Sequence, residues 1–445
     1  MAIGKRLLIV LLGACLGALA VIIWLADAKV APPERLELDP LKRGFARPRG
    51  LPFPGNEVPA PAMIALGERL FHDPRLSSNG GVSCASCHIP ALGLADGVAI
   101  STAGMTGKPL RRHTPSLWNL SWAPLLFWDG RAESLEDQAR FPIGHPDEMA
   151  SSPDDAAGRL AREPAYVPAF AAAFPGTAAI TGEMVLKAIA AFERTLVSPP
   201  TRFDRWLAGD SNALSEEQRL GFALFAGKAQ CVNCHSGFAF TDHSFHDIGL
   251  PGTDRGRGAI IGMSKVDYAF KTPALRELAW TAPYMHNGSK ATLEDVVRHY
   301  ESGGIRRASR SPDMPRPFTL SDDERAALVA FLGSLSSDTP PKPSTEPWVR
   351  QGRPLLVVTS VTGRVVTQRN TSFAPGAIRV ARGQSITILN DDTRTHNIRI
   401  RHPLLDFNSG AQEPGESVVL KLDANGLFEA HCGIHPTMRL RIEVE

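Results

Sequence analysis

The chain lacks a strong net charge, and it has few cysteines. Lysine and arginine together number 48 against 46 acidic residues, so the formal net charge of the 445-residue chain is only +2. A nucleic-acid surface needs a basic excess, and we therefore expect no nucleic-acid partner. Of the six cysteines, Cys15 lies in an apolar leader. The other five are odd in number, which excludes a framework that pairs every cysteine in a disulfide.

The N-terminus has the order of segments that an export signal has. Lys5 and Arg6 precede a mostly apolar run from Leu7 to Leu25, and small residues follow it. At about 1.5 Å per residue, this run would nearly span a bilayer as a helix. Three outcomes stay open: residues 1–28 are cleaved as a signal peptide, they remain as a membrane anchor, or Cys15 carries a lipid. Each outcome predicts that the rest of the chain lies in the periplasm.

The middle of the chain is predicted to be helical. Residues 29–60 are rich in Pro, Arg and Gly, which indicates a linker that drapes over the first domain. From 61 to 336 the signals are mainly helical, and Met184–Leu196 places its apolar residues on one stripe. Capping residues predict three more helices. They begin at Ser215 with Gln218, at Thr292 with Gly303 closing the helix, and at Ser321 with Glu324, this last running to about Leu335.

The character of the sequence changes at Ser337. Residues 337–350 are rich in proline and predict a stiff linker. Residues 351–445 contain short runs of Val, Ile and Thr separated by turn residues, which is typical of a small β-sandwich. The predicted strands are Leu355–Thr359, Ile378–Ala381, Ser385–Leu389, His396–Ile400, Ser417–Leu422 and Leu440–Val444.

Two short motifs account for four of the cysteines. Cys84–His88 and Cys231–His235 both have the form C-x-x-C-H, the attachment pattern of a c-type haem. The two thiols of each motif add to the vinyl groups of one haem, and the adjacent histidine binds the iron. A redox disulfide or half of a zinc site is the alternative, but zinc needs further ligands at set spacings. We therefore predict two covalently bound haems, attached at Cys84, Cys87, Cys231 and Cys234, with His88 and His235 as iron ligands.

Residues 61–336 resemble the bacterial di-haem cytochrome c peroxidases and the related MauG enzymes. The matching stretches are Gly67–Pro74, Ser83–His88, Phe127–Arg131, Thr272–Arg276, Thr281–Gly288 and Thr292–Tyr300. The resemblance implies two cytochrome c-like domains. Residues 61–205 would hold a peroxidatic haem, and residues 206–336 an electron-transfer haem.

The resemblance also implies roles for single residues. Trp128 matches a tryptophan that lies between the haems and relays electrons, and Gln138 matches an amide of the distal pocket. Glu148 matches the distal carboxylate, which would move a proton from the inner to the outer oxygen of peroxide. Tyr300 occupies the position of the second axial ligand of haem two, where the peroxidases have Met and MauG has Tyr. A phenolate ligand favours high oxidation states of iron.

Two departures from the family pattern stand out. Many of the peroxidases have a movable distal histidine after the first haem motif, but this chain has none between His88 and His113. Haem one is then open on its distal face, unless Met105 is a weak ligand. The family also binds calcium through an asparagine and two carbonyls, here those of Thr281 and Pro283. His113 replaces the asparagine, and imidazole is a poor ligand for calcium.

The fifth cysteine belongs to a different pattern. Cys432, His435 and Met438 form C-x-x-H-x-x-M, and His396 lies upstream. Two histidines, a thiolate and a weak axial methionine are the ligands of a type 1 copper site. The alternative is a sandwich with an unused thiol. Residues 351–445 resemble amicyanin and related cupredoxins, and this resemblance also implies one copper ion.

Together these patterns predict a mainly α di-haem cytochrome c region followed by an all-β cupredoxin sandwich. The expected activity is that of an oxidoreductase, a di-haem peroxidase that reduces hydrogen peroxide to water with electrons from its own copper domain. One alternative is a MauG-like oxidase that acts on a protein or a small molecule. The other is an electron carrier without peroxide turnover. A periplasmic cytochrome or cupredoxin is the expected protein partner.

Overall fold

The computed structural model describes residues 42–53, 58–342, 349–350 and 365–445. The predicted leader and the predicted strand Leu355–Thr359 therefore lie outside the described residues. Within the described part of the chain, no helix combines the length and the apolar character needed to cross a bilayer. The elements below belong to residues 44–445, which form one contact unit.

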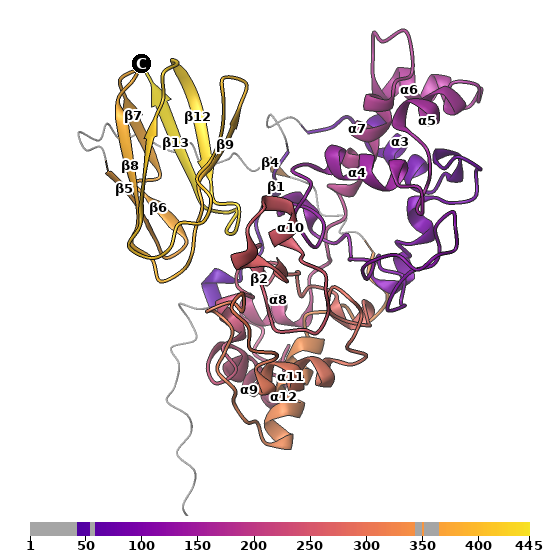
Figure 1. Cartoon of the computed structure of the whole chain (residues 1–445). Coiled ribbons are helices and arrows are strands. Elements are labelled where there is room, and N and C mark those ends of the chain that lie inside the picture. The colour runs from indigo at the N-terminus through magenta and orange to yellow at the C-terminus, as the bar shows by residue number, and fades with distance from the viewer. Residues whose placement is uncertain (1–41, 54–57, 343–348, 351–364) are drawn as a thin grey trace, which may run out of the picture. The chain divides into compact units, whose positions relative to one another are not determined.

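Five helices build the first haem region, and Figure 1 shows them gathered together. They are α3 (Pro61–Phe71), α4 (Leu135–Gly144), α5 (Pro153–Leu160), α6 (Val167–Ala173) and α7 (Gly182–Glu193). The side chains of Ser134, Ser152 and Thr181 cap α4, α5 and α7 by accepting from a backbone N–H of the first turn. Helices α3 and α7 touch at Gly67, where a Cβ would lie 1.9 Å from the carbonyl oxygen of Ala188. The close crossing therefore requires glycine at this position.

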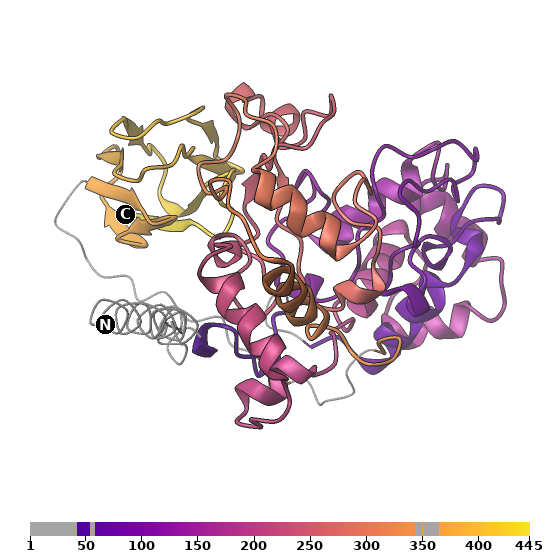
Figure 2. The ribbon, with the colours of Figure 1, turned by 90° about the horizontal axis from the view of Figure 1, so that it is seen from below.

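The second haem region repeats this arrangement. Its helices are α8 (Arg202–Leu207), α9 (Glu216–Ala226), α10 (Arg257–Ile261), α11 (Leu293–Ser302) and α12 (Asp322–Gly333). The helix starts predicted at Ser215, Thr292 and Ser321 are all confirmed, and each has a capping box. Helix α9 packs against α12 (Figure 2), and a Cβ at Gly221 would lie 2.0 Å from the carbonyl oxygen of Ala327. Each half thus uses a glycine to bring the helix before its cysteine motif against a later helix.

The predicted N-terminal linker contacts both haem regions. Phe45 is only 1% exposed, and its ring contacts those of Phe203, Phe222 and Phe240. Leu51 packs with Val197 of residues 61–205, so the linker also contacts the first domain, whereas Phe45 lies in this aromatic cluster. An aromatic residue of this size is most stable where other rings remove it from water, and the second region supplies that cluster.

A buried ion pair holds the second region together. Arg276 donates from Nη1 and Nη2 to the Asp204 carboxylate, at 2.6 and 2.8 Å, and from Nε to the Phe238 carbonyl oxygen at 2.9 Å. Its side chain is completely buried. A guanidinium in that position needs a partner for each of its donors, because an unpaired buried charge is strongly unfavourable.

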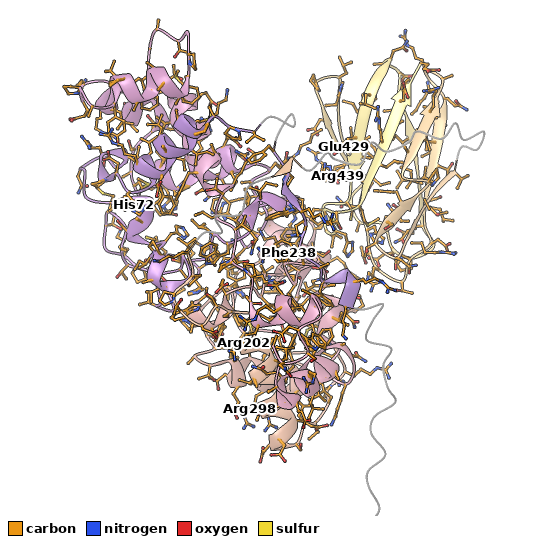
Figure 3. The ribbon with its side chains drawn as sticks, turned by 180° about the vertical axis from the view of Figure 1, so that it is seen from behind. His72, Arg202, Phe238, Arg298, Glu429 and Arg439 are labelled. Atoms are coloured by element: carbon orange, nitrogen blue, oxygen red, sulfur yellow. The ribbon has the colours of Figure 1, made fainter. Side chains whose placement is uncertain are left out.

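Replacing Arg276 by methionine should lower the free energy of unfolding by about 3–5 kcal/mol, because the buried Asp204 carboxylate loses its two short bonds to Arg276 and keeps the longer ion pair with Arg47 at 3.7 Å. Urea unfolding followed by circular dichroism measures the change. Arg298, labelled in Figure 3, gives the matched control, since it pairs with Glu294 on the exposed surface of α11. Arg298→Met should cost less than about 1 kcal/mol. Equal effects of the two variants would contradict the importance of the buried pair.

The C-terminal part is a sandwich of two sheets. One sheet has the strand order β10-β9-β12-β13-β7 and the other β11-β8-β5-β6. The strands are β5 (Val365–Arg369), β6 (Ser372–Ala374), β7 (Ala377–Val380), β8 (Ser385–Asn390), β9 (Arg399–His402), β10 (Leu405–Asn408), β11 (Ser417–Lys421), β12 (Gly426–His431) and β13 (Arg439–Val444). Every second residue of β8 and β13 is buried, which gives the sandwich its core. Figure 3 labels Glu429 and Arg439, which form an ion pair between β12 and β13.

Four of the predicted strands are confirmed within one residue at most ends, as β7, β8, β11 and β13. The strand predicted at His396–Ile400 begins later, at Arg399, because His396 pairs only with Gln412 in an isolated bridge. Two short pairs complete the described fold. They are β1 (Gly50–Leu51) with β4 (Val349–Arg350), and β2 (Phe245–His246) with β3 (Phe270–Lys271).

Candidate haem and copper sites

The two C-x-x-C-H motifs adopt the same local structure. Each begins with one turn of 3₁₀ helix, η3 (Cys84–Ser86) and η6 (Cys231–Asn233). The backbone N–H of each histidine donates to the carbonyl oxygen of the first cysteine, at 2.9 Å for His88 and 2.8 Å for His235. The turn therefore places both thiols and the imidazole of a motif close together.

The second ring nitrogen of each histidine is left free. Nδ1 of His88 donates to the carbonyl oxygen of Leu94 and Nδ1 of His235 to that of Phe240, both at 2.9 Å. A carbonyl accepts only from a protonated nitrogen, so Nε2 of both rings is the unprotonated one. A metal ligand is typically fixed in this way, because the bond at one nitrogen sets the orientation and basicity of the other.

Both motifs line one continuous cavity of about 760 Å³. Among the residues that line it are Cys87, His88, Cys231, Cys234 and His235. Trp118 also lines it, and its indole Nε1 is buried without a hydrogen-bond partner among the residues that the structure describes. Four half-buried free thiols, two imidazoles with a free nitrogen and an unsatisfied donor fit covalently bound haem.

Gln138 and Glu148 line the cavity on the side of the first haem motif. Gln138 belongs to α4, and Glu148 lies in the loop after that helix, where its backbone N–H donates to the carbonyl oxygen of His145 at 3.0 Å. Burial raises the pKa of the Glu148 carboxyl, although His145 and Arg131 nearby oppose the shift. A carboxyl with a raised pKa at a cavity wall is suited to accept and return a proton.

Trp128 is held firmly between the two motifs. Its indole Nε1 donates to the carbonyl oxygen of His113 at 2.8 Å, and its own carbonyl oxygen accepts from the backbone N–H of Lys271 at 2.8 Å. Its ring lies beside that of His286, with centroids 6.5 Å apart. The side chain lines the same cavity as His88 and His235. The structure thus places Trp128, to which the resemblance assigns a relay role, in the same cavity as both haem motifs.

Tyr300 and Met105 occupy different environments. Tyr300, on α11, lines the cavity near the second motif, and burial raises the pKa of its phenol, with Cys234 and Cys231 adding to the rise. Met105 packs against the apolar cluster of the first region, and its backbone N–H donates to the carbonyl oxygen of Glu148 at 2.9 Å. Its side chain does not line the cavity, whereas that of Tyr300 does.

The residues at the predicted calcium position do not fit calcium. Thr281 and Pro283 line the cavity, as does His113. The His113 imidazole is 5% exposed, and its Nδ1 donates to the carbonyl oxygen of Val98 at 2.9 Å. An imidazole committed to a carbonyl supplies no oxygen ligand, and calcium binds oxygen. We therefore assign no calcium here.

Three of the four predicted copper ligands, His396, Cys432 and His435, converge inside the sandwich, and Met438 is buried in the same core. The Nδ1 atoms of His396 and His435 each lie 3.7 Å from Sγ of Cys432, and 3.0 Å from one another. These side chains and that of Met438 are all at most 4% exposed. Two imidazoles and one thiol that face a common point fit a trigonal type 1 copper site.

Neighbouring residues fix these side chains. Nε2 of His396 contacts the Asp392 carboxylate at 3.2 Å, which orients the ring. The side-chain oxygen of Asn397 accepts from the backbone N–H of Gly433 at 2.6 Å, and so ties together the two loops that carry the ligands. Burial first, and then the charges of His396 and His246, lower the pKa of His435 well below its ordinary value. A neutral imidazole is the form that binds a metal.

Sequence reasoning missed a polar cluster next to the second haem motif. His246, on β2, contacts the Asp242 carboxylate from Nε2 at 2.9 Å and the Ser311 hydroxyl from Nδ1 at 2.8 Å. One polar atom each of Cys234, Asp242 and His246 lies within 4.8 Å of the others. The only available signal was the short distance in sequence from the motif. The buried Arg257 gave no signal at all, since its contacts are far away along the chain.

Comparison with known proteins assigns the helical part to a family. A family model for di-haem cytochrome c peroxidase matches residues 61–212, and one for cytochrome c matches residues 218–336. The methylamine utilization protein MauG of Methylorubrum extorquens is 47% identical over 316 residues, which cover 70% of this chain and 89% of that protein. The chain belongs to the di-haem cytochrome c peroxidase and MauG family.

Further relatives agree with this assignment. The cytochrome c551 peroxidase of Nitrosomonas europaea is 38% identical and covers 62% of this chain and 81% of its own length. The crystal structure of a MauG-like protein associated with microbial copper homeostasis is 32% identical, with a TM-score of 0.61 over 66% of this chain and 94% of its own. The chain is thus a di-haem oxidoreductase, and its family implies two c-type haems. Neither family model extends past residue 336, so the sandwich is additional to them.

Proposed function

We propose that this chain reduces hydrogen peroxide to water in the periplasm, with electrons supplied by its own copper domain. The observation that carries the proposal is the single cavity lined by His88, His235, Trp128 and Glu148. A carboxylate suited to proton transfer and two histidines suited to bind iron line one space, which supports the proposal. The predicted export signal and the two haem attachment motifs support the location outside the cytoplasm.

Each of the cavity residues has a separate role in the proposed reduction of peroxide. When bound, the haems supply redox-active iron, held by His88 and by His235 with Tyr300. Glu148 accepts a proton from the inner oxygen of hydrogen peroxide and returns it to the outer oxygen, which then leaves as water. Gln138 hydrogen-bonds and orients the peroxide. Trp128 bridges the two halves. Two electrons and two further protons convert each peroxide into two molecules of water.

The sandwich would hold one copper ion through His396, Cys432, His435 and Met438. Copper at such a site supplies one electron at a time. Fusion to the haem region raises the local concentration of this donor far above that of a separate protein. A periplasmic cytochrome or cupredoxin would refill it.

The experiment that tests the proposal adds hydrogen peroxide to copper-loaded protein with its copper reduced and colourless. The haem bands and the blue copper–thiolate band are followed together. We expect the blue band to rise as the oxidised haem region returns to its resting spectrum. Haem bands that do not change when peroxide is added would overturn the proposal and favour an electron carrier.

The second candidate is a MauG-like oxidase of a protein or small molecule. Tyr300 in the cavity favours it, because a phenolate ligand stabilises high oxidation states of iron. The same experiment separates the two functions. If the haem region stays oxidised while copper remains colourless, the copper domain is not the electron donor. This result would support the function of a MauG-like oxidase that oxidises another partner.

A further inference from the structure

The sandwich and the helical part of the chain share one buried surface. The apolar cluster that fills the sandwich continues through Leu125, Phe245, Met263 and Val266 of the helical part. Charged pairs surround this apolar centre, namely Arg394 with Asp313, Arg401 with Glu133, and Lys265 with Glu413. An apolar centre inside a polar rim is the anatomy of a stable protein interface. The contact therefore holds the sandwich in one fixed position on the helical part.

Residues at the centre of this contact connect the predicted copper site with the predicted site of haem two. The backbone N–H of Phe245 donates to the carbonyl oxygen of Ile434 at 3.1 Å, and Ile434 immediately precedes His435. Phe245 is followed on β2 by His246, which is buried beside Cys234 of the second haem motif. A path of backbone bonds, one hydrogen bond and the close side-chain contact of His246 with Cys234 thus joins a copper ligand to the segment that attaches haem two.

Arg257 fastens both sides of the contact. Its Nε donates to the carbonyl oxygen of Gly433 at 2.8 Å, and its Nη1 donates to those of Gly130 at 2.8 Å and Asp129 at 3.1 Å. The guanidinium lies 4.4 Å from the centre of the Phe245 ring. The residue is 4% exposed, and burial lowers its pKa to about 10, so it is still charged at neutral pH. Charge-assisted bonds from one rigid group hold the copper loop and the loop after Trp128 in register.

We propose that this contact is a built electron junction between the copper site and the haem held at His235, with Arg257 as its positioning residue. The inference rests on the proposed function, because it deepens the step in which the copper domain supplies electrons. One electron leaves a cuprous ion, which becomes cupric, and lowers the charge of the iron at His235 by one. No covalent bond breaks at the junction. Because the sandwich is held in a fixed position, electron transfer does not require it to diffuse to the haem region as a tethered domain.

Arg257→Met tests the junction, and Arg255→Met is the matched control. Arg255 lies two residues earlier, is about half exposed and pairs with Asp267 at 2.9 Å. The holoprotein is photoreduced by one electron without peroxide, and equilibration between copper and haem is followed in the absorption bands of both. We expect Arg257→Met to slow this transfer several-fold, because without the three hydrogen bonds from Arg257 the copper loop moves away from the segment of haem two. Arg255→Met should leave the rate unchanged.

Hydrogen exchange supplies a readout that is independent of electron transfer. The Phe245 amide is bonded to Ile434, so it should exchange faster in Arg257→Met and at the wild-type rate in Arg255→Met. Arg257→Lys keeps the charge but not the planar fork, and should show a smaller loss of rate. It also serves as the test if the methionine variant does not fold.

Two results would overturn the junction. One is an unchanged transfer rate with unchanged protection of Phe245 in a folded Arg257 variant. The other is a wild-type transfer rate that falls with solvent viscosity, which is typical of a tethered search. Because peroxide is absent from these measurements, a failure of peroxide turnover would contradict the proposed function while leaving the junction standing.

Discussion

Replacing Glu148 by glutamine should lower the rate of peroxide turnover about 100-fold or more, since general acid–base catalysis typically contributes 10²–10⁴-fold. The amide has nearly the shape of the carboxyl but neither accepts nor returns a proton at neutral pH. Turnover is measured in the steady state with a small-molecule electron donor, so that the copper domain does not limit the rate. A pure electron carrier, by contrast, would transfer electrons unchanged in this variant.

The pH profile gives this prediction a second, sharper form. Burial raises the pKa of Glu148, and the carboxylate is the form that accepts the proton. The rate should therefore fall as the pH drops through this raised pKa, at a higher pH than an exposed glutamate, near pKa 4.3, would give. Glu148→Gln should lack this acid limb. Glu183→Gln is the control, since Glu183 is exposed and pairs with Arg140 at the surface. A variant of Glu148 with wild-type rate and profile would contradict the assigned role.

Replacing Cys432 by serine should abolish the blue copper–thiolate band completely. The band arises from the bond between copper and the Cys432 sulfur, and a hydroxyl gives neither the softness nor the charge of a thiolate at neutral pH. Turnover supported by reduced copper should be lost with it. Turnover with a small-molecule donor that reduces the haems directly should persist, because the haem cavity lies in the other part of the chain. Absorption spectra and copper analysis of the purified protein measure the first effect.

The neighbouring residue His431 provides the control for this variant. His431 ends β12, directly before Cys432, and it does not belong to the group formed by His396, Cys432 and His435. His431→Asn should therefore keep both the blue band and bound copper. A blue band that survives in Cys432→Ser, or vanishes in His431→Asn, would show that the ligands are assigned incorrectly.

Local signals in the sequence were reliable for this chain. A capping box needs only two residues three positions apart, so Ser215 with Gln218 and Ser321 with Glu324 identified the first turns of α9 and α12. A haem motif needs five consecutive residues, and both adopt the same turn. Prediction failed where pairing with a distant strand decides the outcome. Strand β12 was missed because its position depends on β9 and β13 on either side.

The sequence by itself predicted the haem and copper ligands within each motif, because ligand spacing within a loop is fixed by the covalent chain. It also determined the division into a helical part and a β-sandwich, through the change from helical to strand periodicity near Ser337. Only the tertiary structure decided that His396 meets Cys432, that Glu148 and Trp128 share a cavity with both motifs, and that Arg257 contacts Gly433. The two contacts join residues 36 and 176 positions apart, and burial of apolar surface, not backbone geometry, brings them together.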